Sequence, residues 1–144
     1  MEIEIRSPKT ESEWNEYYDL RYRVLREPWN QPRGSERNEG DLTGIHAAYF
    51  SQGKLTGIVR IDKSDESISQ IRFMAVEFKE QGKGIGDKLM REMEVIAYER
   101  GDKKIILHAR EIAIGFYEKL GYKLLNKSHN LFGEIQHFLM EKEL

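Results

Sequence analysis

Hydrophobic positions recur along this chain with two different periods, and the two periods predict strands and helices in turn. Apolar runs of period two, or unbroken ones, predict strands at about 2–6, 44–51, 54–62, 66–77, 104–109, 121–126 and 133–141. Apolar residues spaced three or four apart predict helices at roughly 10–26, 84–100 and 112–120. The segment 27–41 is polar and contains Pro28 and Pro32, so we expect a loop there with one short helical turn.

The order of these elements predicts the fold class. We expect an α/β fold (α+β in some schemes), with residues 1–144 forming a single domain. Its sheet should be mixed, mostly antiparallel and twisted, with about six or seven strands flanked by about four helices. Gln52-Gly53 and the polar residues 63–66 should form the turns between the middle strands.

Composition and charge exclude several classes of function. A net charge of −2 gives no electrostatic reason to expect a nucleic-acid partner. No apolar run approaches the roughly 20 residues of a membrane span, and residues 1–5 lack a signal-peptide core, so we expect a cytoplasmic protein. The chain has no cysteine, which excludes an acyl-cysteine intermediate. No pair of histidines has metal-ligand spacing with a matching carboxylate, so we expect no metal.

A glycine-rich turn between a predicted strand and a predicted helix carries the first functional signal. Residues 81–86 read QGKGIG and precede the helix at 84–100. Glycines let a ligand approach the backbone, and the unpaired amides and dipole of a helix start favour an anion. We therefore expect a pyrophosphate site. The spacing is neither that of a P-loop nor that of a dinucleotide fingerprint, and the alternative is a helix start with convenient glycines.

A second motif follows about 30 residues later, and the two motifs together resemble the GNAT superfamily of acyl-CoA-dependent N-acetyltransferases. That family's phosphate loop reads [QR]-x-x-G-x-[GA], which Gln81, Gly84 and Gly86 match. Its later signature, aromatic-Tyr-x-Lys-x-Gly-[FY], is matched by Phe116, Tyr117, Lys119, Gly121 and Tyr122. The resemblance covers nearly the whole chain. It implies acetyl-CoA as co-substrate, direct transfer to an amine, and a possible homodimer.

Four further segments are similar to a branch of that family typified by glyphosate N-acetyltransferase: 21–26, 70–75, 109–110 and 135–140. In that branch the matching arginines bind an anionic amine and the matching histidine acts as base. By position these residues are Arg26, Arg72, Arg110 and His137. His108 stands where the branch has an asparagine, and the loop 27–41 looks unrelated, so the particular acceptor does not carry over.

The resemblance also implies the contacts of the cofactor. The expected residues are Met74, Ala75, Val76, Gln81, Gly82, Lys83, Gly84, Ile85, Gly86 and Tyr117. Backbone amides around 73–76, on a distorted central strand, would stabilise the oxyanion. Lys83 could contact a phosphate of CoA or be solvated.

Direct acetyl transfer requires a base for the amine and benefits from an acid for the thiolate. Histidine suits the first task, and His137 is the candidate, although a half-buried strand histidine bonded to a carbonyl is the alternative. Tyr117 is the candidate acid, or else a packing aromatic residue. The arginines could bind substrate or pair with some of the 25 acidic residues. His46 and His129 carry no expected role, since we place them at the start of a strand and in a polar turn.

Three hypotheses of function remain open at this point. The first is an N-acetyltransferase acting on a small, anionic amine such as an amino acid or aminophosphonate. The second keeps the chemistry with a protein lysine or N-terminus as acceptor, which the arginines disfavour because like charges repel. The third is a CoA-binding regulatory module without catalysis.

Overall fold

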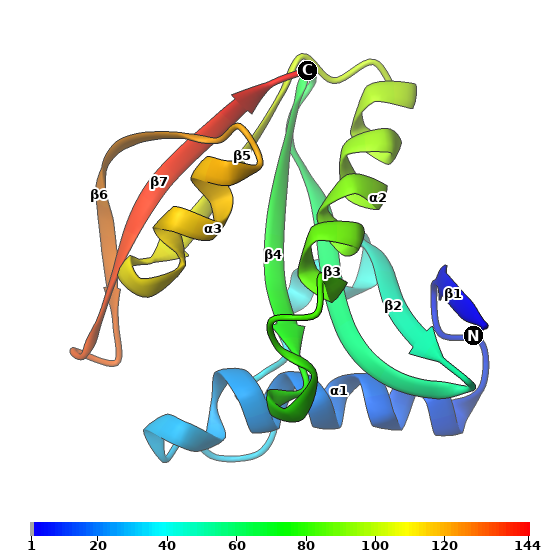
Figure 1. The fold of residues 1–144 in the computed structure, drawn as a ribbon. Coiled ribbons are helices and arrows are strands. Elements are labelled where there is room, and N and C mark those ends of the chain that lie inside the picture. Colours follow the sequence, from blue (N-terminus) through cyan, green and yellow to red (C-terminus); the bar gives the residue numbers. More distant parts are fainter. Residues whose placement is uncertain (1) are drawn as a thin grey trace.

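The structure is a computed structural model that describes residues 2–144, and its centre is one twisted sheet of seven strands (Figure 1). The strands lie in the order β1-β2-β3-β4-β5-β7-β6. Their bounds are β1 (Ile3–Arg6), β2 (Ile45–Ser51), β3 (Lys54–Asp65), β4 (Ile68–Val76), β5 (Lys104–Arg110), β6 (Lys123–Leu131) and β7 (Ile135–Glu143). Only β4 and β5 pair in parallel. The expected mixed, mostly antiparallel fold is confirmed.

Three α-helices pack on this sheet, one fewer than the expected number of about four. They are α1 (Glu11–Leu25), α2 (Ile85–Glu99) and α3 (Ile114–Lys119). Short 3-10 turns fill the connections: η1 (Glu27–Trp29), η2 (Glu39–Leu42), η3 (Phe78–Glu80) and η4 (Glu111–Ala113). The loop 27–41 thus contains or begins two helical turns instead of the expected one. No helix within residues 2–144 is both long enough and apolar enough to cross a membrane.

Helices cover both faces of the sheet, which explains the unbroken apolar runs in the middle strands. Along β2, Ala47 and Tyr49 belong to the core cluster that contains Leu89 and Met93 of α2. The intervening Ala48 and Phe50 belong to the cluster beneath α1. A strand that is buried on both faces is apolar at successive positions, so its sequence does not alternate between apolar and polar residues.

The one parallel pair of strands separates halfway along, and this separation positions the site. β4 pairs with β5 only from Ile68 to Ile71, opposite 104–107. Beyond that point β4 carries a bulge at Phe73, whose φ of 57° is unusual for a residue other than glycine. β5 instead stays with β7 as far as Arg110 opposite His137. The two strands therefore diverge toward the end of α1 (Figure 1).

Candidate active site

A cavity of about 580 Å³ lies where β4 and β5 diverge. Side chains from α1, β4, the glycine turn, β5, α3 and the β6–β7 hairpin line it. It brings together the predicted site residues except one: Arg26, Arg72, Met74, Ala75, Val76, Gln81, Gly82, Gly84, Ile85, Gly86, Arg110, Tyr117 and His137. Lys83 does not line the cavity, and its Nζ lies 2.8 Å from Glu80 Oε2 in an exposed ion pair.

The glycine turn at the start of α2 presents unpaired backbone amides. Gly82 and Gly84 have φ of 82° and 87°, and a Cβ added to either would meet only open space. No side chain caps the helix, and among the described residues none accepts a hydrogen bond from the amides of 82–87. These donors are free for an anion. Gly86 has a different reason to be glycine, because its Cβ would lie 3.2 Å from the Phe116 ring.

The diverging end of β4 leads from this turn into the cavity. Its edge toward β5 has no strand partner after Ile71, so the backbone there is open to a ligand. The side-chain amide of Gln81 donates from Nε2 to the carbonyl of Val76 at 3.1 Å and connects the glycine turn to the end of the strand. An extended chain bound at the turn can therefore continue along β4.

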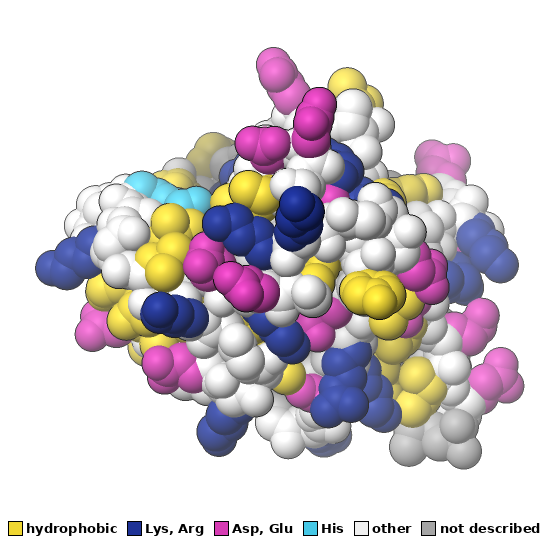
Figure 2. Space-filling model, turned by 90° about the horizontal axis from the view of Figure 1, so that it is seen from above, with side chains coloured by type: hydrophobic (Ala, Val, Ile, Leu, Met, Phe, Trp, Pro, Cys, Tyr) yellow, Lys and Arg dark blue, Asp and Glu magenta, His cyan; other side chains and the backbone are white. Residues whose placement is uncertain are grey.

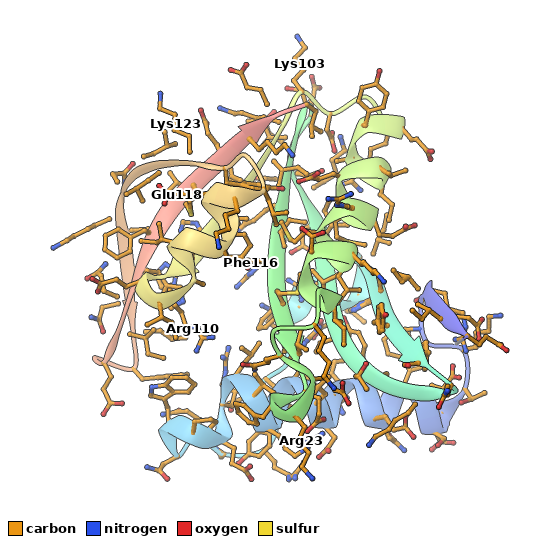
Figure 3. All side chains as sticks on the ribbon, in the orientation of Figure 1. Arg23, Lys103, Arg110, Phe116, Glu118 and Lys123 are labelled. Atoms are coloured by element: carbon orange, nitrogen blue, oxygen red, sulfur yellow. The ribbon has the colours of Figure 1, made fainter. Side chains whose placement is uncertain are left out.

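Tyr117 lies on α3 with its ring buried and its hydroxyl without a hydrogen-bond partner among the described residues. The rings of Phe116 and Tyr122 pack edge-on against it at 5.0 and 6.0 Å between centroids. Figure 3 shows Phe116 on the side of α3 that faces α2. Burial raises the pKa of Tyr117 to about 12, so the hydroxyl remains protonated at neutral pH and can donate its proton.

His137 on β7 has one ring nitrogen bound and the other free. Its Nδ1 lies 3.0 Å from the carbonyl oxygen of Ile135. A carbonyl only accepts, so Nδ1 carries the hydrogen of the neutral ring and Nε2 keeps its lone pair. Burial lowers the pKa of His137, and the nearby His129, Arg110 and His108 lower it further. The ring is therefore neutral at neutral pH, as a base must be.

Two more histidines meet His137 at the cavity wall. The ring of His129 lies 4.4 Å from that of His137 at 12°, and 5.1 Å from that of His108. Sequence analysis missed His129 because it placed the residue in a turn. That expectation is wrong, since β6 continues to Leu131 and carries His129 alongside β7. Residues 126–130 are all polar and exposed, so no alternation in the sequence could have placed His129 on a strand.

Arg72 and Arg110 face the cavity without acidic partners. Within residues 2–144 neither guanidinium forms an ion pair or a hydrogen bond. The guanidinium carbon of Arg72 lies 5.1 Å from the centre of the Phe73 ring, and that of Arg110 lies 5.7 Å from the centre of the Trp29 ring. Figure 3 places Arg110 at the end of β5, toward the loop that follows α1. Burial lowers the pKa of Arg72. The alternative hypothesis, that these two arginines pair with carboxylates of the protein, is therefore wrong for the described residues.

Arg26 is held more firmly by the protein itself. Its Nε donates to the carbonyl of Ser35 at 3.1 Å and its Nη1 to that of Leu25 at 2.9 Å. The guanidinium lies 5.7 Å from the ring of Phe73 and 5.3 Å from that of Phe132. Arg26 thus links α1, its following loop and the tip of the β6–β7 hairpin, and has fewer donors left for a ligand.

The charges at the two ends of the cavity differ in sign. Among the described residues, the carboxylates lining it are Glu80 and Asp87, both beside the glycine turn. The opposite end holds the arginines and the three histidines. No group of histidine, aspartate and glutamate in residues 2–144 is arranged to hold a metal ion.

Comparison with known proteins identifies the class. The model of the acetyltransferase (GNAT) family matches residues 12–122, so the chain belongs to this family of acyltransferases. The N-acetyltransferase YjcF of Bacillus subtilis is 26% identical over 135 residues, which cover 94% of this chain and 96% of that protein. The resemblance to the GNAT superfamily is thereby confirmed, whereas the resemblance to the glyphosate N-acetyltransferase branch stays a prediction.

Solved structures of the same fold agree over the whole length. Escherichia coli ElaA superposes with a TM-score of 0.83 at 23% identity, covering 99% of both chains. An aminoglycoside 6'-N-acetyltransferase complexed with coenzyme A gives a TM-score of 0.80 at 20% identity, covering 99% of this chain and 97% of that one. These likenesses show the fold.

Proposed function

We propose that residues 1–144 act as one N-acetyltransferase domain that transfers acetyl from acetyl-CoA directly to the amine of a small anionic acceptor, such as an amino acid or an aminophosphonate. The observation that carries this proposal is the pair Arg72 and Arg110, two cations without acidic partners at one end of the cavity. Arg110 is half-buried and Arg72 is exposed at the cavity, and an anionic ligand would accept charge-assisted hydrogen bonds from both guanidinium groups.

The free amides of 82–86 are the proposed seat of the CoA diphosphate, and the open edge of β4 at Met74, Ala75 and Val76 the path of its pantetheine arm. The coenzyme A found with a protein of the same fold supports this assignment. Acetyl-CoA supplies the activated acyl group as a thioester.

The residues of the cavity account for each proton in the transfer. An alkylamine with a pKa of about 10.4 arrives protonated, and Nε2 of His137 takes one proton from it. The amine nitrogen then attacks the thioester carbonyl, forming the new C–N bond. Backbone amides near the bulge at Phe73 stabilise the oxyanion. As the C–S bond breaks, Tyr117 donates its proton to the departing sulfur. The nitrogen of the new amide then gives its extra proton to the tyrosinate, which restores Tyr117, and His137 returns its proton to solvent.

Thiol release measured with dithionitrobenzoate tests this proposal. Purified protein with acetyl-CoA is offered amino acids, aminophosphonates, polyamines and peptides, each with and without enzyme. We expect turnover on acceptors that carry a carboxylate or phosphonate near the amine. Preference for polyamines or lysine peptides would support the protein-acceptor hypothesis instead. Binding of acetyl-CoA without turnover on any acceptor would favour the regulatory module.

A further inference from the structure

Three imidazole rings from three strands meet at the anion-binding end of the cavity, and the ring in the middle has no role in the proposed chemistry. His137 comes from β7, His108 from β5 and His129 from β6. His129 contacts both of the others. His129 is exposed and His108 is half-buried, so solvent reaches this group, and Figure 2 shows histidine side chains at the molecular surface.

The geometry of the pair His129 and His137 limits the charge that the two can carry. Their rings lie nearly parallel, at 12° and 4.4 Å between centroids. Two imidazolium ions at this separation repel each other, and the repulsion grows as water is excluded. A positive charge on one ring therefore disfavours a positive charge on the other.

The other charged groups around His137 add to this effect. Arg110 stands opposite it on β5, and His108 lies on the same strand. His108 Nδ1 is buried without a hydrogen-bond partner among the described residues. On the flanking elements, Lys127 of β6 and Glu111 of η4 are exposed and do not line the cavity. No carboxylate lining this end of the described cavity offsets a positive charge on His137.

We propose that His129 is a positioning residue for His137: its ring lies flat against the base, fixes the orientation of the imidazole, and disfavours a second positive charge there. His137 then stays neutral, with Nε2 ready to accept a proton, at a pH where an isolated histidine would be protonated. The Nδ1 bond to the carbonyl of Ile135 fixes the tautomer, and the stacked ring fixes the plane.

Titration of the histidine ring signals by NMR tests the proposal in the free protein. Two variants remove the competing charge: His129→Phe keeps a flat ring, and His129→Gln keeps a polar side chain. We expect the apparent pKa of His137 to rise by about 0.5 unit or more in both, as expected for a like charge roughly 4 Å away. Asn130→Ala, on the same exposed strand, is the matched control and should leave it unchanged.

His46 provides an internal reference in the same spectra. It is bonded to the hydroxyl of Tyr17 and the carbonyl of Asp41, outside the cavity. Its titration should be the same in all variants. A pKa of His137 that stays within about 0.2 unit of wild type in both His129 variants would overturn the proposal.

The pH profile of kcat/KM gives a second readout, which rests on the proposed acetyl transfer. In His129→Phe the acidic limb should move to higher pH by the shift that NMR records, with the plateau largely retained. A merely structural role would lower the plateau and leave the limb in place. Because the NMR titration needs no turnover, failure of the His129 proposal can be told apart from failure of the proposed function.

Discussion

Two sets of arginines surround the ring of Phe73, and they differ in their partners. Arg21 and Arg60 are fully buried, with guanidinium carbons 4.3 and 4.9 Å from the ring. Both donate to Asp41, at 2.8 and 2.7 Å, and Arg60 also forms a bidentate pair with Asp62. Arg72 lies 5.1 Å from the same ring but contacts no acidic residue within the described chain.

This contrast separates structural charge from charge available to a ligand. Arg21 and Arg60 both form ion pairs with Asp41. These ion pairs connect three elements: α1, η2 and β3. A buried cation that is satisfied in this way holds the wall of the cavity in place. Arg72 and Arg110 lie on that wall without acidic partners in the described chain, and an anionic ligand is the partner that we propose for them.

The largest expected effect is on the free energy of unfolding, which should depend on Arg60 but not on Arg72. Arg60→Met leaves the partly buried Asp62 and Asp41 with fewer partners, and it should reduce the free energy of unfolding by about 3 kcal/mol or more. Arg72→Met, the matched control, removes no ion pair and should change it by less than about 0.5 kcal/mol. Urea unfolding followed by circular dichroism measures both. Equal losses of stability in the two variants would contradict the distinction between paired and unpaired arginines.

The second largest expected effect is on activity, where Arg72 and Arg110 should matter most. Arg72→Gln and Arg110→Gln should each lower kcat/KM for an anionic acceptor by about 30-fold, since a charge-assisted hydrogen bond contributes roughly 2 kcal/mol. The affinity for CoA should remain that of the wild type. Thiol-release kinetics with an acceptor and its uncharged amide analogue provide the control. An equal loss on both acceptors would show that the arginines do not bind the anion.

Tyr122 and Tyr117 differ in the same way as the arginines, and the expected effects are smaller. The hydroxyl of Tyr122 donates to Glu94 at 2.9 Å, whereas that of Tyr117 has no partner among the described residues. Tyr117→Phe should lower kcat by about 10-fold or more, with stability and the KM for acetyl-CoA nearly unchanged. Tyr122→Phe should instead cost about 1 kcal/mol of stability. Loss of CoA binding in Tyr117→Phe would indicate a packing role.

The smallest effect uses pH to confirm which arginines are paired. Burial raises the pKa of Asp41, but its bonds from Arg21, the Asn38 amide and Arg60 outweigh this and hold the pKa below its usual value. A lowered carboxylate pKa adds stability above about pH 3.8 and loses it as the pH falls further. The difference in unfolding free energy between wild type and Arg60→Met should therefore become smaller from pH 7 to pH 3. The gap for Arg72→Met should not change.

Sequence patterns predicted the fold more completely than the site. Strand and helix positions follow from local periodicity, and the two motifs locate the glycine turn and Tyr117 because each motif is contiguous. The unexpected second turn of segment 27–41 follows a stretch whose carbonyls, at Ser35 and Glu36, accept hydrogen bonds from Arg26 and Arg21. No local pattern records such bonds.

The partners of the arginines were also beyond the reach of sequence. Arg60 reads as a polar residue within an apolar strand, and Arg72 as one on the next strand. The two residues stand opposite each other in the pairing of β3 with β4, and of the two only Arg60 bonds to Asp41, which comes from η2. His129 was missed because the pairing of β6 with β7 is irregular, with one register shift before this residue and another across it, between Lys127 and Asn130. Long-range pairing, not residue type, assigns these roles.

Calorimetric titration of CoA into two glycine variants tests the central claim most directly. Gly84 and Gly101 begin and follow the same helix, with φ of 87° and 84° and open space at the Cβ position of each. Replacing either by aspartate strains the backbone equally, so both variants should lose similar stability. The account predicts that Gly84→Asp abolishes CoA binding while Gly101→Asp binds as tightly as wild type. Undiminished binding to Gly84→Asp would contradict it.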